Sequence, residues 1–401
     1  MTDVPKPDEA EASPSPVVRG SSQSELRAHN ERLILSILRN HGPTAKAEIA
    51  RMTGLSAQSA SVIMRKLEGE SLIERCAPVR GKVGQPSIPM RLATDGALFF
   101  GLKVGRRSTD MILVDFLGTI LDRVHLTYRY PEPDQTLGFV HDSIAQITKK
   151  LTAQQRDRIA GLGIAIPGYL WEWAKIIDEP SDKMDTWKER DIRAEIDDLY
   201  DFPVYLQNDA TCACGAELVF GGQDYPAEFL YFYVGYFIGG GVVINHALFT
   251  GPTGNAGALG PLPAGGTQGA QLIDVASLSG LEKSMLDAGA DAAALWESSA
   301  SWNVDRDLLS RWLDQAAEGL AHAIVVSCSV IDFELVVIDG WLPEEVRREL
   351  VDLTAEKMRK LNWAGLIQPD VREGSIGPDA RSLGAASLPL SQRFMVSKRV
   401  F

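Results

Sequence analysis

Apolar residues in the first quarter of the chain recur three and four positions apart, which is the spacing of amphipathic helices. This spacing predicts a helix over residues 29–42, a short helix over 45–52, and a longer helix that begins near Ala57 and is capped by Ser56. The turn at 53–55 contains a glycine, so the second and third helices fit a helix-turn-helix. We expect the buried face of the third helix to carry Val62, Ile63, Leu67 and Leu72.

The opposite face of the third helix is left with small, amide and basic side chains, which suit the base edges of a DNA major groove. Residues 72–92 follow as two expected strands around a Gly/Lys/Gly tip, which resembles the wing of a winged helix and suits a minor groove. The predicted contacts to double-stranded DNA are Ser56, Ala57, Gln58, Ser61, Arg65, Arg80 and Lys82. The alternative is a helical hairpin that packs on the rest of the protein and whose charges are only solvated.

From residue 97 the pattern changes to short apolar strands, followed by alternating helices and strands, and this order occurs twice. Such an order is typical of an α/β protein with two similar lobes, whose ligands bind in the cleft between facing strand ends. The apolar segment 229–249 is long enough to suggest a membrane span. Its three central glycines and its β-branched and aromatic residues favour two buried strands instead, so we expect no membrane association.

The charge of the chain is distributed unevenly. The net charge of -13 over 401 residues, taken alone, argues against nucleic-acid binding. Residues 21–92, however, contain eleven Lys or Arg and six Asp or Glu, whereas the rest of the chain contains 29 and 47. A basic front on an acidic body predicts an N-terminal module that meets phosphate. Four scattered cysteines and an acidic, proline-rich start predict a reducing, cytoplasmic location.

Several motifs of the body resemble the ROK family, which comprises sugar kinases and sugar-responsive repressors with an actin/hexokinase-type fold. They are "GLGIAIPG" (161–168), "QNDATCACGAELVFG" (207–221), "GGGVVIN" (239–245), "GNAG" (254–257) and "LGAASL" (383–388), and "RGKVGQPS" (80–87) resembles the repressor branch. The resemblance implies an α/β protein made of a disordered tail (1–22), a winged helix-turn-helix (23–95), and two ribonuclease H-like lobes (96–207 and 208–387). A C-terminal helix over 388–401 is expected to return to the first lobe.

The chain departs from the family's kinases on the sugar side of the expected cleft. The family's A-G-E-x-G-H pattern binds sugar hydroxyls and zinc through its glutamate and histidine, and here these positions are Ala258 and Pro261. A further sugar-binding glutamate is replaced by Ile273. The family's zinc-binding cysteines would follow within "PAGGTQGAQL" (263–272), which contains no cysteine. We therefore expect no bound metal.

The nucleotide side departs as well. Lys103 stands where the resemblance implies an aspartate that organises Mg²⁺, and Arg106 and Arg107 replace small residues of the first phosphate loop. In the second loop, over 235–241, tyrosine and phenylalanine replace small residues. Phosphoryl transfer depends on positioning and charge stabilisation, so these changes predict no catalytic residue and no cofactor.

Asn208 and Asp209 survive from the family pattern. In the kinases this aspartate takes a proton from the sugar hydroxyl as general base, and its structural alternative is to cap the helix that starts near Ala210. A sugar-like or anionic effector, if one exists, is expected at Asn208, Asp209, Gly257 and Lys183. The resemblance implies a DNA-binding regulator of carbohydrate-related genes that forms a homodimer or tetramer. The alternatives are a ROK sugar kinase fused to a DNA-binding domain, and a scaffold that binds another protein.

Overall fold

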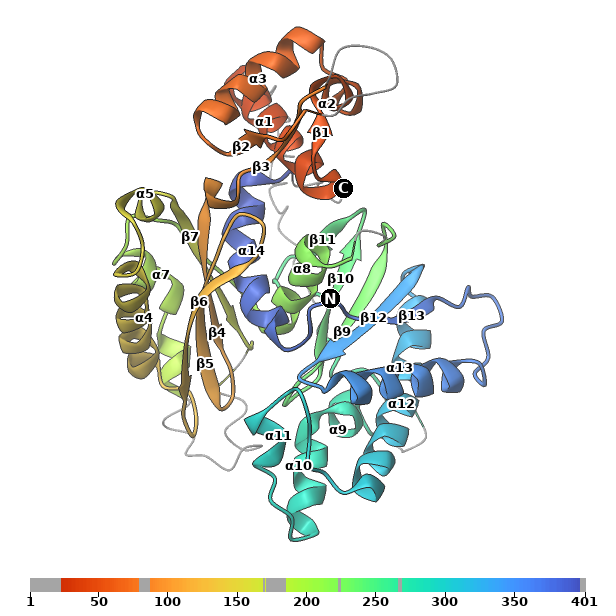
Figure 1. The fold of residues 1–401 in the computed structure, drawn as a ribbon. Helices are drawn as coiled ribbons and strands as arrows, with labels where there is room; N and C mark the ends of the chain where they lie inside the picture. The colour runs from red at the N-terminus through yellow and green to blue at the C-terminus, as the bar shows by residue number, and fades with distance from the viewer. Residues whose placement is uncertain are drawn as a thin grey trace, which may run out of the picture.

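The structure is a computed structural model that describes residues 23–78, 87–168, 170, 185–222, 225–265 and 269–396. Figure 1 shows a small N-terminal unit seated on two larger α/β units, each built around its own sheet. The predicted fold class, an N-terminal winged helix-turn-helix followed by a two-lobed α/β body, is confirmed. Arg80, Lys82 and Lys183, which were predicted from the sequence, lie outside the described residues.

The N-terminal unit is a winged helix. Its helices are α1 (Gln23–His41), α2 (Lys46–Thr53) and α3 (Ala57–Gly69), and its antiparallel sheet has the order β1 (Thr44–Ala45), β3 (Pro89–Leu92), β2 (Ile73–Arg75). Ile34, Leu38, Ile49 and Met64 form its core. The turn between α2 and α3 is made by Gly54, whose φ of 69° is accessible to glycine at little cost.

One residue of α3 was assigned wrongly from the sequence. Val62 is 43% exposed and is not part of the buried face. The buried residues of α3 are Ala60, Ile63, Met64 and Leu67. At 3.6 residues per turn, Val62 lies about 200° around the helix from Ala60, so it belongs to the outer face.

The first body sheet has the order β6-β5-β4-β7-β8. Its strands are β4 (Leu98–Val104), β5 (Ser108–Val114), β6 (Ile120–Thr127), β7 (Ile159–Ile166) and β8 (Val204–Asn208). The helices α4 (Pro133–Thr148) and α7 (Ile192–Asp197) cover one face of this sheet through an apolar cluster, and α5 (Ala153–Arg156) lies near its end (Figure 1). The other face is covered by the last helix of the chain, α14 (Ala380–Phe394).

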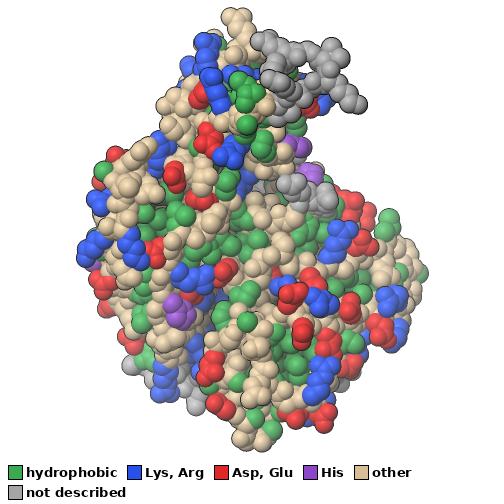
Figure 2. Space-filling view, viewed as in Figure 1, with side chains coloured by type: hydrophobic (Ala, Val, Ile, Leu, Met, Phe, Trp, Pro, Cys, Tyr) green, Lys and Arg blue, Asp and Glu red, His purple; other side chains and the backbone are tan. Residues whose placement is uncertain are grey.

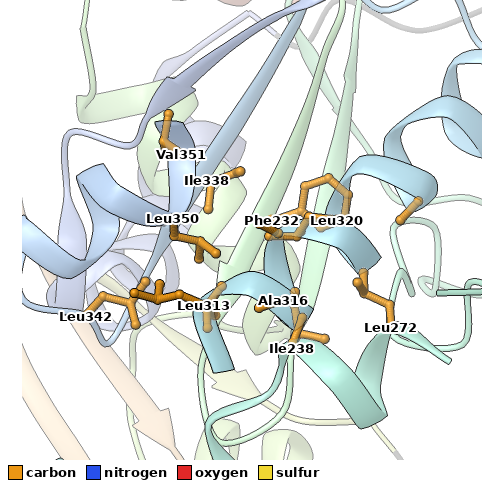
Figure 3. Packing of buried hydrophobic residues seen from close by; sticks show 14 of the residues in the cluster. Phe232, Ile238, Leu272, Leu313, Ala316, Leu320, Ile338, Leu342, Leu350 and Val351 are labelled. Atoms are coloured by element: carbon orange, nitrogen blue, oxygen red, sulfur yellow. The ribbon is translucent and has the colours of Figure 1, made fainter. Parts of the chain in front are cut away.

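The second body sheet has the order β11-β10-β9-β12-β13. Its strands are β9 (Phe229–Val234), β10 (Gly239–Ile244), β11 (Ala247–Phe249), β12 (Leu335–Gly340) and β13 (Asp370–Glu373). Figure 3 shows Leu313, Ala316 and Leu320 of α12 (Arg306–Cys328) packed against Phe232 and Ile338 of the sheet, beside Leu350 of α13 (Glu344–Met358). The remaining helices of this unit are α9 (Leu272–Ala276), α10 (Leu278–Asp287) and α11 (Ala294–Glu297).

The apolar segment 229–249 forms strands β9, β10 and β11, so the membrane-span alternative for it is wrong. Across the residues that the structure describes, we find no helix of the length and apolar character needed to span a membrane.

Two helices fill the space between the two sheets. These are α14 and α8 (Asp209–Phe220), and they pack on each other more closely than side chains would allow. A Cβ atom on Gly384 of α14 would lie 1.8 Å from the carbonyl oxygen of Cys212 on α8. Glycine is therefore required at this crossing, and the helix pair forms a rigid link between the two halves of the body.

Candidate functional site

The N-terminal end of α3 is built by local capping. Ser56 precedes the helix in an extended conformation, and its Oγ accepts a hydrogen bond from the backbone N–H of Ser59 at 3.1 Å. This confirms Ser56 as the N-cap. The side chains of Ala57, Gln58 and Arg65 are exposed, and Ser61 is half-buried on the same side of the helix. The Ser56 hydroxyl is engaged in the capping bond, which fixes the start of the helix. The next two residues, Ala57 and Gln58, are exposed to solvent.

The basic side chains of this unit differ in how far their charge is neutralised. Lys66 donates to both oxygens of Glu31, at 2.7 and 2.8 Å, and Arg75 pairs with Glu68 at 2.6 Å. Arg65 makes no ion pair with any described residue and only donates to the carbonyl oxygen of Ser61, at 3.3 Å. Arg65 is therefore a cation of α3 that is free to meet phosphate or a base. Figure 2 shows Lys and Arg side chains at the outer end of this unit.

The first phosphate loop of the body is filled by an internal ion pair. Lys103 is buried, and its Nζ donates to Asp110 Oδ2 at 2.9 Å and to Ser108 Oγ at 2.8 Å. The other oxygen of Asp110 lies 2.7 Å from His125 Nδ1. Burial lowers the pKa of Lys103, whereas Lys103 and His125 outweigh burial at Asp110 and hold the pKa of that carboxyl below its usual value. A lysine in this arrangement cannot organise a magnesium ion, since it is a cation itself.

The two arginines of the same loop reach across to the second half of the body. The Arg106 guanidinium lies 5.3 Å from the centre of the Tyr236 ring, and Arg107 pairs with Glu282 at 2.8 Å. Glu282 also accepts a hydrogen bond from Trp296 Nε1 at 2.9 Å. These contacts join the β4–β5 turn to α10 and to the loop that would face the second phosphate position. Both arginines of this turn are thus engaged by side chains of the second half of the body.

Asp209 is paired with a cation that sequence analysis did not find. Its Oδ2 accepts from Arg381 Nη1 at 3.1 Å, and the Arg381 guanidinium stacks 4.9 Å above the Tyr233 ring. Arg381 lies 172 positions further along the chain. No local sequence motif predicts this ion pair, because it forms only when α14 packs between the two sheets. One oxygen of the Asp209 carboxylate is thus engaged by Arg381.

The N-cap of α8 is Asn208, and Asp209 shares the capping role expected of it, because its Oδ1 also accepts a hydrogen bond from the backbone N–H of Ala210, at 2.9 Å. Asn208 Oδ1 accepts from the backbone N–H groups of Ala210 and Thr211, at 3.0 and 3.3 Å. Asp209 is the first residue of α8 itself. The Asn208 amide nitrogen faces the turn at Gly168, where a Cβ would lie 3.8 Å from it. Asn208 therefore uses its oxygen for structure and keeps its N–H donors toward the first sheet.

Gly257 has a packing role. It has a φ of 86°, and a Cβ there would lie 2.7 Å from the Cα of Gly241 on β10. The glycine-rich loop thus lies directly on a glycine-rich strand, which keeps the family's backbone path without its polar side chains. Ile273 packs on the apolar cluster beneath α12, and its neighbour Asp274 accepts from the Gln271 N–H at 2.9 Å as a helix cap. Ile273 has no polar group for a sugar hydroxyl, and Asp274 uses one of its carboxylate oxygens in the cap.

The described part of the chain contains no group of three or more His, Cys, Asp or Glu side chains placed to hold a metal ion. The Cys-Ala-Cys pair at Cys212 and Cys214 is fully buried on α8. Burial raises the pKa of both thiols well above the usual value, which keeps them protonated. These cysteines therefore act as small packing residues against α14 and β10, and the family's zinc cluster does not fit this chain.

Residues 99–392 match the model of the ROK family, and residues 29–79 match the model of the MarR family. An uncharacterised protein of Sinorhizobium fredii is 23% identical over 374 residues, which cover 92% of each chain. The xylose repressor of Bacillus subtilis is 28% identical over 244 residues, which cover 60% of this chain and 62% of that repressor.

Among solved structures, a ROK-family transcriptional regulator described as a homolog of the E. coli MLC protein has a TM-score of 0.67 at 19% identity, covering 92% of this chain and 97% of its own. The ROK-family glucokinase of Streptomyces griseus has a TM-score of 0.54 at 20% identity, covering 73% of this chain and 99% of its own. The first similarity shows a fold shared over 92% of this chain, and the second shows a fold shared over 73% of it. Because the ROK family model matches residues 99–392, which are most of the chain, the chain belongs to the ROK family.

Proposed function

We propose that this protein is a DNA-binding transcriptional regulator whose kinase-like body does not transfer phosphoryl groups. The observation that carries the proposal is a contrast in how charge is used. On α3, Arg65 is exposed and has no ion-pair partner among the described residues, whereas in the body Lys103, Asp209 and the arginines of the first loop are bound to other residues of the same chain. The side chains available to bind another molecule therefore lie on the winged helix, whereas the charged side chains of the body already bind one another.

The DNA contacts follow from the exposed face of α3. Gln58 suits the N6 and N7 atoms of an adenine, and Arg65 suits a guanine or a phosphate. Ser56, Ala57 and Ser61 lie at the start of the same face and allow close approach to DNA. Arg80 and Lys82 of the wing tip are proposed to meet the backbone or the minor groove. A homodimer would hold two such units on a two-fold operator.

The body is proposed to sense a small molecule and to report it to the winged helix. Several relatives are named xylose repressors, which supports a link to carbohydrate-related genes. The proposed effector is sugar-like or anionic and contacts Asn208, Asp209 and Lys183. Release of Asp209 from Arg381 would free one carboxylate for a hydroxyl group. Gly257 contributes by keeping the loop close to β10 rather than by direct contact.

The experiment is a fluorescence anisotropy titration with DNA from upstream of the protein's own gene, repeated at several salt concentrations. Gln58→Ala should weaken binding to this DNA by about 1–3 kcal/mol and leave binding to random DNA nearly unchanged. Arg65→Ala should weaken binding to the upstream DNA and lower the slope of log K against log[salt] by about one unit if it meets a phosphate.

The control is Lys360→Ala, which removes an exposed, ion-paired cation that follows the end of α13, away from the winged helix. Its affinity and salt slope should equal those of the unmodified protein. Equal losses for Gln58→Ala on specific and random DNA would contradict the base contact. ATP, Mg²⁺ and a panel of hexoses should yield no ADP, and hexose-dependent ADP release would support the kinase alternative instead.

A further inference from the structure

The outer face of α3 presents one apolar side chain in the middle of polar ones. Val62 is 43% exposed, in contrast to the neighbouring Ile63, which is 6% exposed. Gln58, Val62 and Arg65 follow one another at steps of four and three residues, so their side chains form one stripe along the helix. Val62 is the central position of that stripe.

Local stability gives no reason for a valine at this position. A β-branched side chain loses rotamer freedom in a helix, so valine is a weaker helix former than Ala, Lys or Glu. Exposure also leaves its methyl groups in water, where they add nothing to the core. Both effects favour a different residue on an outer helix face, and an apolar contact made outside the folded chain would offset them.

We propose that Val62 contacts the C5-methyl group of a thymine, and so selects thymine at one base pair of each operator half-site. The proposal rests on the proposed function, in which α3 enters the major groove. Thymine is the base that presents an apolar group there, whereas cytosine presents an amino donor and the purines present polar edges. A polar edge set against Val62 would lose its water without gaining a hydrogen bond, which is unfavourable.

The neighbours of Val62 fix where that thymine lies. Gln58 stands one helical turn before it and Arg65 nearly one turn after it, and both offer polar groups to adjacent bases or phosphates. The valine methyls therefore reach the groove between two polar contacts that position the helix. Val62 thus acts as a specificity-determining residue, and Gln58 and Arg65 set the register in which it reads.

The test removes the methyl group from the DNA and from the protein in turn. The operator is first obtained by selecting bound duplexes from a random-sequence library with the full chain. Each thymine is then replaced by deoxyuracil, which differs only by the C5-methyl group. For the unmodified protein, one position in each half-site should lose about fourfold in affinity, the equivalent of one buried methyl-sized group. Val62→Ala should bind the thymine and uracil operators equally well.

Two controls separate this effect from others. Leu26→Ala removes another exposed apolar side chain, 52% exposed on α1, and should keep the full uracil sensitivity. The melting temperature of Val62→Ala should not fall, because alanine is the better helix former. Uracil sensitivity that persists in Val62→Ala, or that is absent from every position of the unmodified protein, would overturn the inference while the regulator function stands. Failure to enrich any sequence would overturn both.

Discussion

At the residue scale, residues at positions where the family resemblance places kinase chemistry pair with other side chains of the same chain. Lys103 forms an ion pair with Asp110, and Arg381 forms one with Asp209. Asp209 stands at the position where the family resemblance places the general base of the kinases. The sequence predicted the losses at Lys103, Ala258 and Ile273 because each stands in a recognisable motif. It did not predict Arg381, because an ion pair between residues 172 positions apart has no local pattern.

The Asp209–Arg381 pair should behave as a buried ion pair. Both side chains are about 15% exposed, so Arg381→Met would leave a largely buried carboxylate without its cation. We expect a loss of about 3–5 kcal/mol in the free energy of unfolding. The double variant Asp209→Leu/Arg381→Met removes both charges and should be closer to the unmodified protein than Arg381→Met alone. Urea denaturation of the unmodified protein, of both single variants and of the double variant measures this.

An exposed ion pair provides the comparison for that cycle. Arg306 pairs with Glu349 on the surface, with the arginine side chain 66% exposed, so Arg306→Met should cost less than about 1 kcal/mol. If the losses of Asp209→Leu and Arg381→Met simply add in the double variant, the two residues do not interact, and the base would be free for other chemistry.

At the element scale, the helix pair α8 and α14 joins the cleft to the winged helix. Asp209 meets Arg381 where both helices begin, and both helices contact α1 near their other ends. At the far end of α14, the backbone N–H of Val396 donates to Ser36 Oγ at 3.0 Å. The Phe394 ring packs edge-on against Phe116, with centroids 5.0 Å apart. A change in the cleft thus has a contiguous packed path to the DNA-binding unit.

The periodicity of the chain predicted most of these elements, and their bounds differ by a few residues. The sequence predicted that residues 384–388 lie in a final helix and that a C-terminal helix runs over 388–401, whereas α14 spans Ala380–Phe394. The predicted burial of Val62 is wrong because an apolar side chain need not be buried. A binding face can also be apolar, and spacing relative to Ala60 and Met64 would have placed Val62 outside.

Arg39 should hold the winged helix on the body. It donates to the carbonyl oxygens of Phe116 at 2.8 Å and Val219 at 3.3 Å, and it stacks on the Phe220 ring at 4.9 Å. Burial lowers the pKa of Arg39 to about 10, against the opposing effect of Asp115, so it stays charged at neutral pH. Arg39→Met leaves two acceptors without this donor, which costs about 1–3 kcal/mol for each acceptor that stays buried.

Hydrogen exchange is the measurement for this prediction. In Arg39→Met the amides of α1 should exchange faster, while those of β9 and β12 in the second sheet should keep their rates. Arg27→Met, which removes an exposed partner of Glu31 on the same helix, should leave α1 unchanged. Unchanged α1 exchange in Arg39→Met would show that the winged helix is held by its apolar contacts alone.

At the scale of the whole molecule, the N-terminal unit and the body differ in charge and in how their charged side chains are paired. The basic front carries exposed, partly unpaired cations on a winged helix, and the acidic body keeps a kinase fold whose cleft is filled by its own side chains. The contact between Arg107 and Glu282 joins the two halves of the body at the place where nucleotide phosphates would lie.

The central claim, that the open chemistry of this protein lies on α3 and reads DNA, is tested most directly by selection from fragmented genomic DNA of its own organism. The full chain and the double variant Gln58→Ala/Arg65→Ala are incubated with the fragments, and the bound DNA is sequenced. The account predicts a two-fold symmetric sequence enriched by the unmodified protein, with half-sites one helical turn or a multiple apart, and lost with the double variant. No enriched sequence, or the same sequence enriched equally by both proteins, would contradict it.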